Sequence, residues 1–307
     1  MPLLNSLGSM FTGALCQGLL WSVMAIGVYI SFRILDFADM TAQGSFPLGA
    51  SVAAALVVAG VNPVLATVVA VLSGVLAGMI TGFLNTVFKI PPLLAGILTM
   101  TGLYSINLRV MGKAQVPLLK ETTVLTYFQN LGLSSKGAGI AVGALCVAIV
   151  IAVLWWFFNT ELGYAVRATG DNPHMIRALG VSTNRMTVLG LALGNALVAF
   201  SGALVCQYQQ YSNATMGNGT IVIGLAAVII GEVFFRDKNN VRALIAVVLG
   251  SIIYRIVVAL VYLFGAEPND MSLISAIILS LLLALPVGRE VLGKFVSRRQ
   301  IRGDGHA

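Results

Sequence analysis

Residues that could carry out catalysis are few in this chain and lie far apart. The only two histidines are His174 and His306, and the three cysteines fall in apolar segments without the paired spacing of a metal or disulfide site. The chain has no G-x-S-G sequence of an intramembrane serine protease, no pair of aspartates inside one apolar run, and no GxxxxGK[ST] phosphate-binding loop. The sequence therefore predicts a protein that is not an enzyme and that holds no metal or cofactor of its own.

One charged residue, Arg255, lies deep inside an apolar run, about fourteen residues after the run begins. An unpaired guanidinium at mid-membrane costs several kcal/mol, so the residue needs a partner. Glu232 falls near one membrane surface and Glu267 and Asp270 near the other, so none of these acids matches its depth. Snorkelling, a backbone carbonyl or a substrate carboxylate could each satisfy it, and a structural role is favoured over substrate contact.

A polar, basic stretch from residue 159 to 185 contains the outline of one short helix. Asn172 suits the N-cap, Pro173 the first helical position, and Gly180 the left-handed position after the helix. Arg177 lies in the last turn, where a cation is favoured. Such a helix is about 10 Å long, too short to cross a bilayer but long enough to dock on another protein.

The composition predicts an all-α, polytopic membrane protein that forms a single domain over residues 1–307. With 58% hydrophobic and 9% charged residues, the chain cannot cover a soluble globule with polar surface. Apolar runs of spanning length predict about nine transmembrane helices, at residues 11–32, 44–60, 63–84, 93–110, 137–158, 184–206, 219–235, 241–264 and 271–288. No Lys or Arg precedes the first run, so we expect no cleavable signal peptide.

Basic residues predict the orientation. With the amino terminus outside, 13 of the 18 Lys and Arg residues lie on the inner side, 4 lie outside, and Arg255 lies within a span. Short basic loops are retained on the cytoplasmic side. The segment 159–185 and the basic tail 289–307 are therefore expected in the cytoplasm, and the connection 111–136 on the outer surface.

Small and polar residues around two spans indicate a translocation pathway. Gly44 and Gly49 have the same spacing as Gly219 and Gly224 in a span of opposite direction, as in the inverted repeats of transporters, although chance explains so short a match equally well. The stretch from Arg33 to Pro47 ends in a proline that disturbs regular helix, so a broken segment near the pathway is one interpretation of it. An ordinary cytoplasmic turn between the first two spans explains Asp36 and Asp39 equally well. The candidate pathway residues are Gln43, Gly44, Ser45, Pro47, Gly219, Gly224 and Arg255.

Glycines at intervals of four residues indicate close helix packing. Gly74, Gly78 and Gly82 recur in the third predicted span, and Gly190 and Gly194 in the sixth. Such grooves let another helix approach closely. Packing within one subunit is favoured over a homodimer contact.

Two stretches carry a family resemblance. RILDFADMTAQGSFPLGA and GYAVRATGDNPHMIRALGVSTNRMTVLGLALGNALVAFSGAL resemble the second-span region and the cytoplasmic signature of ABC importer permeases of the branched-chain amino acid and sugar class. The continuation QYQQYSNATMGNGTIVIGLAAVIIGEVFF is most similar to bacterial permeases of the tryptophan or tyrosine type. The resemblance implies import of an aromatic amino acid, with branched-chain amino acids, nucleosides or sugars as alternatives. Ion-coupled secondary transport is a further alternative.

The resemblance also implies partners and a role for the short helix. It implies a permease homodimer or close heterodimer in the bacterial inner membrane, two cytoplasmic ATPase subunits that bind ATP and Mg, and an extracytoplasmic binding protein that does most of the substrate selection. The helix from Asn172 to Leu179 becomes the coupling helix, which docks on an ATPase. The residues expected at that contact are Arg167, Asp171, Asn172, Pro173, His174, Arg177 and Gly180, and His174 departs from the family's commoner acidic residue.

Overall fold

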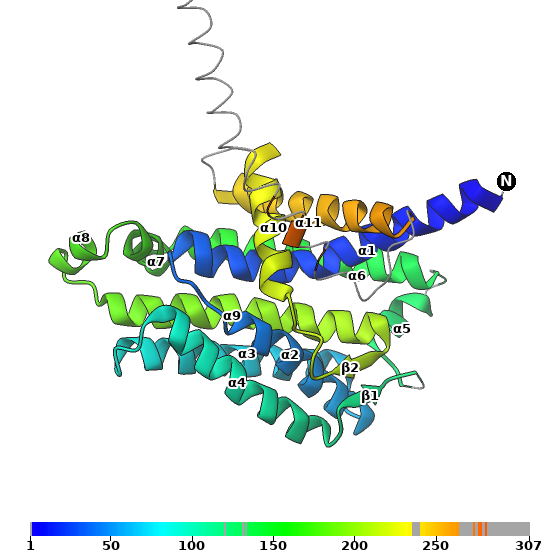
Figure 1. The fold of residues 1–307 in the computed structure, drawn as a ribbon, viewed down its shortest axis with the longest axis horizontal. Coiled ribbons are helices and arrows are strands. Elements are labelled where there is room, and N and C mark those ends of the chain that lie inside the picture. Colours follow the sequence, from blue (N-terminus) through cyan, green and yellow to red (C-terminus); the bar gives the residue numbers. More distant parts are fainter. Residues whose placement is uncertain are drawn as a thin grey trace, which may run out of the picture.

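The protein is an elongated helical bundle with a small antiparallel sheet at one end (Figure 1). This computed structural model describes residues 2–234, apart from 120, 131 and 133, together with 240–263 and the single positions 273, 276, 277 and 280. The helices are α1 (Pro2–Tyr29), η1 (Ile30–Ile34), α2 (Ala42–Val58), α3 (Pro63–Thr86), α4 (Pro92–Met111), α5 (Val124–Gln129), α6 (Ser135–Phe158), α7 (Glu161–Asp171), α8 (Pro173–Ala178), α9 (Thr183–Gln209), α10 (Thr220–Phe234) and α11 (Asn240–Leu263); the strands are β1 (Gln115–Pro117) and β2 (Tyr211–Asn213).

The first eight predicted spans each coincide with one of these helices, and the ninth, 271–288, lies largely outside the described residues. Among the described helices six are long and apolar enough to cross a membrane, and two apolar helices, α2 and α10, are shorter. The all-α polytopic class is therefore confirmed, and the count of nine stays a prediction. Side chains such as Leu76 on α3 and Trp156 on α6 are more than half exposed, as expected of a surface that faces lipid.

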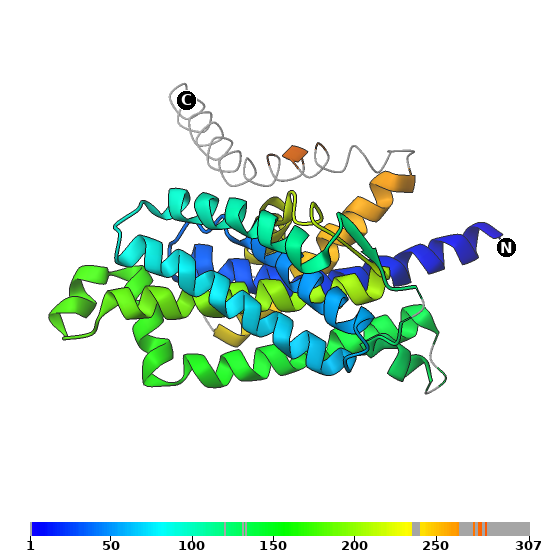
Figure 2. The same ribbon diagram turned by 90° about the horizontal axis from the view of Figure 1, so that it is seen from below.

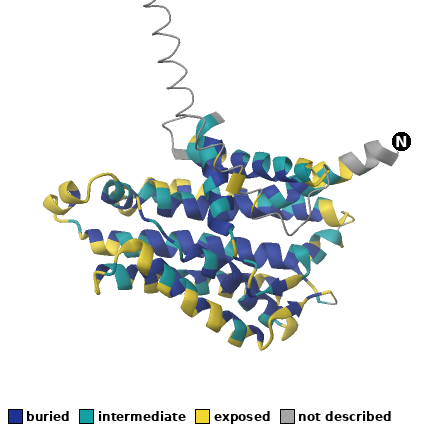
Figure 3. Ribbon diagram, viewed as in Figure 1, coloured by how far each residue is buried: buried dark blue, intermediate teal, exposed yellow. Residues whose placement is uncertain are grey.

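The centre of the bundle is built from α2, α3 and α9, which contact one another through glycines. A Cβ at Gly74 or Gly78 of α3 would meet the backbone of α9 at 2.5 Å or less, and Gly49 of α2 lies against Ala199 of α9 in the same way. Because only hydrogen fits there, the helices approach more closely than larger residues would allow. The predicted packing role of these glycines is confirmed, and Figure 3 shows α9 as a largely buried helix through the bundle.

The remaining spans flank this centre. Helix α1 contacts α6, α9, α10 and α11, while α4 lies on the opposite side of the bundle from α6 (Figure 2). The π-helix η1 ends the first span, and residues 35–41 then lead without regular helix into α2. Pro47 lies inside α2, and the helix continues through it, so the break expected around this proline instead precedes the helix.

The connection 111–136 carries more structure than the sequence indicated. It contains β1 and α5, and β1 pairs with β2 in register Val116↔Ser212. Its apolar residues Val116 and Leu118 are buried against the ends of α2 and α9. This sheet marks the end of the bundle opposite to α8 (Figure 1).

Candidate functional site

The short helix α8 is held by local hydrogen bonds at both ends. The Asn172 side-chain oxygen accepts from the Met175 N–H at 3.0 Å, which caps the amino end. At the carboxyl end the N–H of Gly180 donates to the Arg177 carbonyl at 2.9 Å and that of Val181 to the Ile176 carbonyl at 3.2 Å. Gly180 has φ +81°, so the helix ends in a Schellman motif. The predicted helix and both of its caps are confirmed.

Helix α8 lies at the far end of the bundle (Figure 1), and it exposes apolar side chains. Met175 is 50% and Leu179 71% exposed, whereas Ile176 is buried. His174 and Asp171 are exposed and Arg167 is half-buried on α7. An exposed apolar tip on a small capped helix is suited to bury itself in a groove of another protein.

Helix α7 connects α8 to the membrane-spanning helices. A Cβ at Gly170 would meet the Ile34 carbonyl of η1, and one at Gly163 would meet the Phe157 carbonyl of α6. Arg177 donates from Nε to the Thr183 hydroxyl at 2.7 Å, which joins α8 to the first turn of α9. A displacement of α8 would therefore reach η1, α6 and α9 through close contacts.

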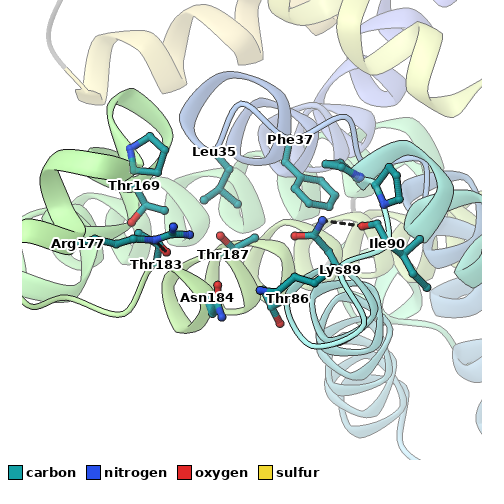
Figure 4. Close-up of a pocket in the computed structure, with 14 residues that line it drawn as sticks. Leu35, Phe37, Thr86, Lys89, Ile90, Thr169, Arg177, Thr183, Asn184 and Thr187 are labelled. Carbon is teal, nitrogen blue, oxygen red and sulfur yellow. Dashed lines mark hydrogen bonds between the residues drawn. The ribbon is translucent and has the colours of Figure 1, made fainter.

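A pocket opens beside α8, with a volume of about 370 Å³ (Figure 4). It lies between the α3–α4 turn, the 35–41 linker, α7, α8 and the start of α9. Its lining residues are Leu35, Phe37, Asn85, Thr86, Lys89, Ile90, Pro91, Pro92, Thr169, Pro173, Arg177, Thr183, Asn184 and Thr187. Of the predicted contact residues it includes Pro173 and Arg177.

A buried carboxylate lies in the linker just before α2. Asp39 is 1% exposed; its Oδ1 accepts from the Thr41 N–H at 2.9 Å and its Oδ2 from the Asn195 amide at 2.7 Å. The Asn195 oxygen in turn accepts from the Ser45 hydroxyl at 2.7 Å. Burial raises the pKa of the Asp39 carboxyl above its ordinary value of 3.8, while hydrogen bonds from Thr41 and Asn195 act in the opposite direction.

A line of threonine hydroxyls extends this network. Thr41 and Thr81 are joined by a hydrogen bond of 2.7 Å, and Thr81 donates to Thr99 at 2.9 Å. All three residues are buried. The network therefore ties the linker to α2, α3, α4 and α9 at one level of the bundle.

The candidate pathway residues of α2 and α10 lie in neighbouring helices, but the matched glycines differ in role. Gly44 is inside α2 and packs against α4, whereas Gly219 has φ +78° in the turn before α10. Gly224 packs against α1. Gln43 is half-buried, and its carbonyl and the Pro47 ring lie against Gly217. Helices α2 and α10 are thus both short and contact each other, but their glycines do not occupy equivalent positions.

Arg255 is buried on α11 and its main partner is aromatic. Its guanidinium lies 4.0 Å from the ring centre of Trp21, and one nitrogen donates to Gln17 at 3.4 Å. Glu232, considered from the sequence as a partner, instead pairs with Arg33 at 2.7 Å. Glu267 and Asp270 lie outside the described residues. The favoured structural role fits this cation–π contact between α1 and α11.

Sequence reasoning missed the polar residues inside the spans. The sequence analysis looked for ionisable acids and did not consider Asn195, Thr81 and Thr99. It also left open whether Asp39 belongs to the pathway or to a solvated turn. An uncharged Asn in an apolar run is a signal that could have been used, because polar groups in a membrane need partners inside the protein.

Comparison with known proteins places the chain in a family. The family described as the permease component of branched-chain amino acid transport systems matches residues 10–285. The chain belongs to this permease family. A tyrosine transport system permease protein of Clostridioides difficile is 40% identical over 268 residues, which cover 87% of this chain and 88% of that protein.

Two further relatives show the breadth of the family. An uncharacterised protein of Rickettsia prowazekii is 32% identical over 87% of this permease and 94% of its own length. The ribose import permease protein of Bacillus subtilis is 30% identical over 63% of this permease and 59% of its own length. No solved structure matches the chain. The protein is thus a membrane-embedded permease component of an ABC-type transport system and not an enzyme.

Proposed function

We propose that this permease is the membrane subunit of an ATP-driven importer for tyrosine or a related aromatic amino acid, and that α8 is its coupling helix. The observation that carries the proposal is the exposed apolar tip of α8, capped at both ends, in a chain that is 40% identical to a tyrosine transport system permease. The residues proposed at the ATPase contact are Arg167, Asp171, Asn172, Pro173, His174, Arg177 and Gly180.

The proposed mechanism is mechanical. When two ATPase subunits close around ATP and Mg, the groove that holds α8 moves, and α8 moves with it. Because α7 lies directly against η1 and α6, and Arg177 is bonded to Thr183, the displacement passes to the membrane helices as a rigid-body shift. This shift alternates access to a pathway that we place along α2 and α10, near Gln43, Ser45 and Gly224.

The proposed orientation follows from the coupling role. The α8 end of the bundle faces the cytoplasm, and the sheet end, with the amino terminus, faces outside, as the basic residues also predict. A second copy of the permease completes the translocation unit, and an extracytoplasmic binding protein delivers the solute to the sheet end. The binding protein then sets most of the substrate specificity.

A second function, ion-coupled transport without an ATPase, is favoured by one observation, the buried Asp39 carboxylate. Ionisable groups inside membrane bundles often serve as proton sites. Here both carboxylate oxygens accept short hydrogen bonds, from Thr41 and Asn195, which suits a structural anchor. ATP-driven import is therefore preferred.

The test is purification of the permease with an ATPase and a binding protein from the same cells, reconstituted in proteoliposomes. We expect ATPase activity that rises with tyrosine or tryptophan only when the binding protein is present. Stimulation by branched-chain amino acids, nucleosides or sugars instead would overturn the proposed solute. Uptake that needs a proton gradient and no ATPase would overturn the coupling role of α8.

A further inference from the structure

The pocket beside α8 combines two cations with no acid. Lys89 comes from the α3–α4 turn and Arg177 from α8, and the other lining residues are uncharged. An adjoining pocket, also of about 370 Å³, is lined by the same two residues with Ser182, Thr183 and Asn184. Within the described part of the chain Lys89 has no hydrogen bond or ion pair. The space between these elements is thus positively charged and open (Figure 4).

Lys89 occupies a backbone position that does not favour a lysine. Its φ is +56°, a left-handed conformation that costs a non-glycine residue about 1–2 kcal/mol. The turn is held by Asn85, whose amide donates to the Ile90 carbonyl at 2.9 Å (dashed in Figure 4). Glycine or asparagine would suit this backbone better, so backbone geometry gives no reason for a lysine here. The positive charge that the Lys89 side chain brings to the pocket is a reason for a lysine at this position.

Arg177 is the oriented member of the pair. Its Nε donates to the Thr183 hydroxyl, which fixes the plane of the guanidinium and leaves the two terminal nitrogens without a bond in the described part of the chain. A planar guanidinium held in this way is preorganised to receive a carboxylate at two points. Leu35, Phe37 and Pro91 line the same pocket and suit the methylene groups of an acidic side chain.

We propose that this pocket receives an acidic side chain of the ATPase subunit, between Lys89 and Arg177. The inference rests on the proposed function, because it requires an ATPase seated on α8. A protein that covers the exposed tip at Met175 and Leu179 also covers the neighbouring pocket, and the charge of the pocket is complementary to a carboxylate. A free amino acid fits less well, because no lining residue carries the negative charge that its ammonium group would need.

The consequence is a second point of attachment. The α3–α4 turn then joins α8 as an ATPase contact, and the bound carboxylate holds the two together. ATPase closure would move α3 and α4 with α7, α8 and α9. The Thr81–Thr99 hydrogen bond between α3 and α4 lets these helices respond together.

The test is zero-length carbodiimide cross-linking of the purified permease–ATPase complex, with the joined peptides read by mass spectrometry. We expect an amide bond between Lys89 and an Asp or Glu of the ATPase. Lys89→Arg should lose this cross-link, since arginine does not react. Lys89→Asn, neutral and tolerant of the left-handed backbone, should raise the Kd for the ATPase up to about fivefold, as for a partly exposed ion pair.

Matched controls separate this inference from the proposed function. Lys113 is exposed beyond α4 at the sheet end and should form no cross-link to the ATPase. The Lys113→Asn variant should leave the Kd of the permease for the ATPase unchanged. An ATPase that does not co-purify defeats the proposed function. An ATPase that co-purifies and protects Met175→Cys from thiol labelling, without any cross-link to Lys89, overturns only the acidic contact in the pocket. A bound anionic phospholipid that native mass spectrometry detects and that Lys89→Asn releases would also overturn it.

Discussion

The α2–α9 contact and the α8 helix are stabilised by different kinds of contact, long-range in the first and local in the second. At the first, glycines and a buried polar network join segments more than a hundred residues apart in the chain, such as Asp39 and Asn195. At the second, nearly every stabilising hydrogen bond joins residues within six positions of each other. The difference shows that the bundle is held by tertiary contacts, while the end proposed to meet the ATPase keeps its shape by itself. A locally folded helix can move as a unit without loss of the bundle.

The largest expected effect comes from breaking the close contact of the core. Gly49→Val places side-chain atoms on the Ala199 backbone, which cannot move without shifting α9. We expect a loss of about 3 kcal/mol of stability or more, measured as a lower Tm in detergent. Gly102→Val is the control, because a Cβ at this exposed position of α4 meets nothing within 4 Å. Equal Tm values for the two variants would show that the α2–α9 contact is not tight.

The second effect is a pH dependence specific to the core. Burial raises the pKa of Asp39 in the folded state, so the folded protein binds this proton more strongly than the unfolded chain. The contribution of Asp39 to stability is therefore complete below pH 3.8 and falls as pH rises through the raised folded-state pKa. Tm curves against pH should show this fall in the wild type and not in Asp39→Asn.

The control for this comparison is Asp36→Asn. Asp36 is in the same linker and is exposed, and its φ of +50° is one that asparagine adopts readily. Its Tm curve should run parallel to that of the wild type. If Asp39→Asn also ran parallel to the wild type, the buried carboxylate would have no role in pH-dependent stability.

The two regions also differ in how far the sequence predicts them. The α8 helix follows from Asn172, Pro173 and Gly180 alone, because caps and a left-handed glycine act over a few residues. The Asp39–Asn195 bond depends on how α9 passes the start of α2, which no local pattern specifies. The same reason explains why the partner of Arg255 was not predicted. Glu232 is closer to Arg255 in sequence, but the Trp21 ring lies against the Arg255 guanidinium in the folded bundle.

Apolar runs predicted α1–α4, α6 and α9–α11, because each of these helices is rich in apolar residues, although α2 and α10 are shorter than the other six. The π-helix η1 and the strands β1 and β2 were not predicted. The strands are three residues each and depend on each other, although about a hundred positions separate them in the chain. The glycines at 74, 78 and 82 indicated a close helix contact, while the identity of α9 as the partner required the folded structure.

A third test compares two glycines that share a conformation. Gly180 ends α8 and Gly60 follows α2 at the other end of the bundle; both have φ +81°, and a Cβ at either would meet no atom within 4 Å. Valine at either position should cost about 1–2 kcal/mol of backbone strain. Only Gly180→Val should lose ATPase stimulation and uptake, with membrane insertion intact. Wild-type uptake by a well-expressed Gly180→Val permease would remove α8 from the coupling role.

The smallest expected effect comes from removing one capping hydrogen bond. Its size distinguishes a helix held by local bonds from one held by tertiary contacts. Asn172→Ala removes the N-cap of α8. Asn62→Ala removes the N-cap of α3, where the Asn62 side chain accepts a hydrogen bond from the Val64 N–H at 2.9 Å. Each cap is worth about 1 kcal/mol. Hydrogen exchange at Met175 should quicken about fivefold in Asn172→Ala, because the Met175 N–H itself donates to the Asn172 side chain. Exchange beyond the first turn of α3 should stay unchanged in Asn62→Ala, since that helix is anchored along its length by α9. Unchanged exchange at Met175 would mean that α8, too, is held by its neighbours.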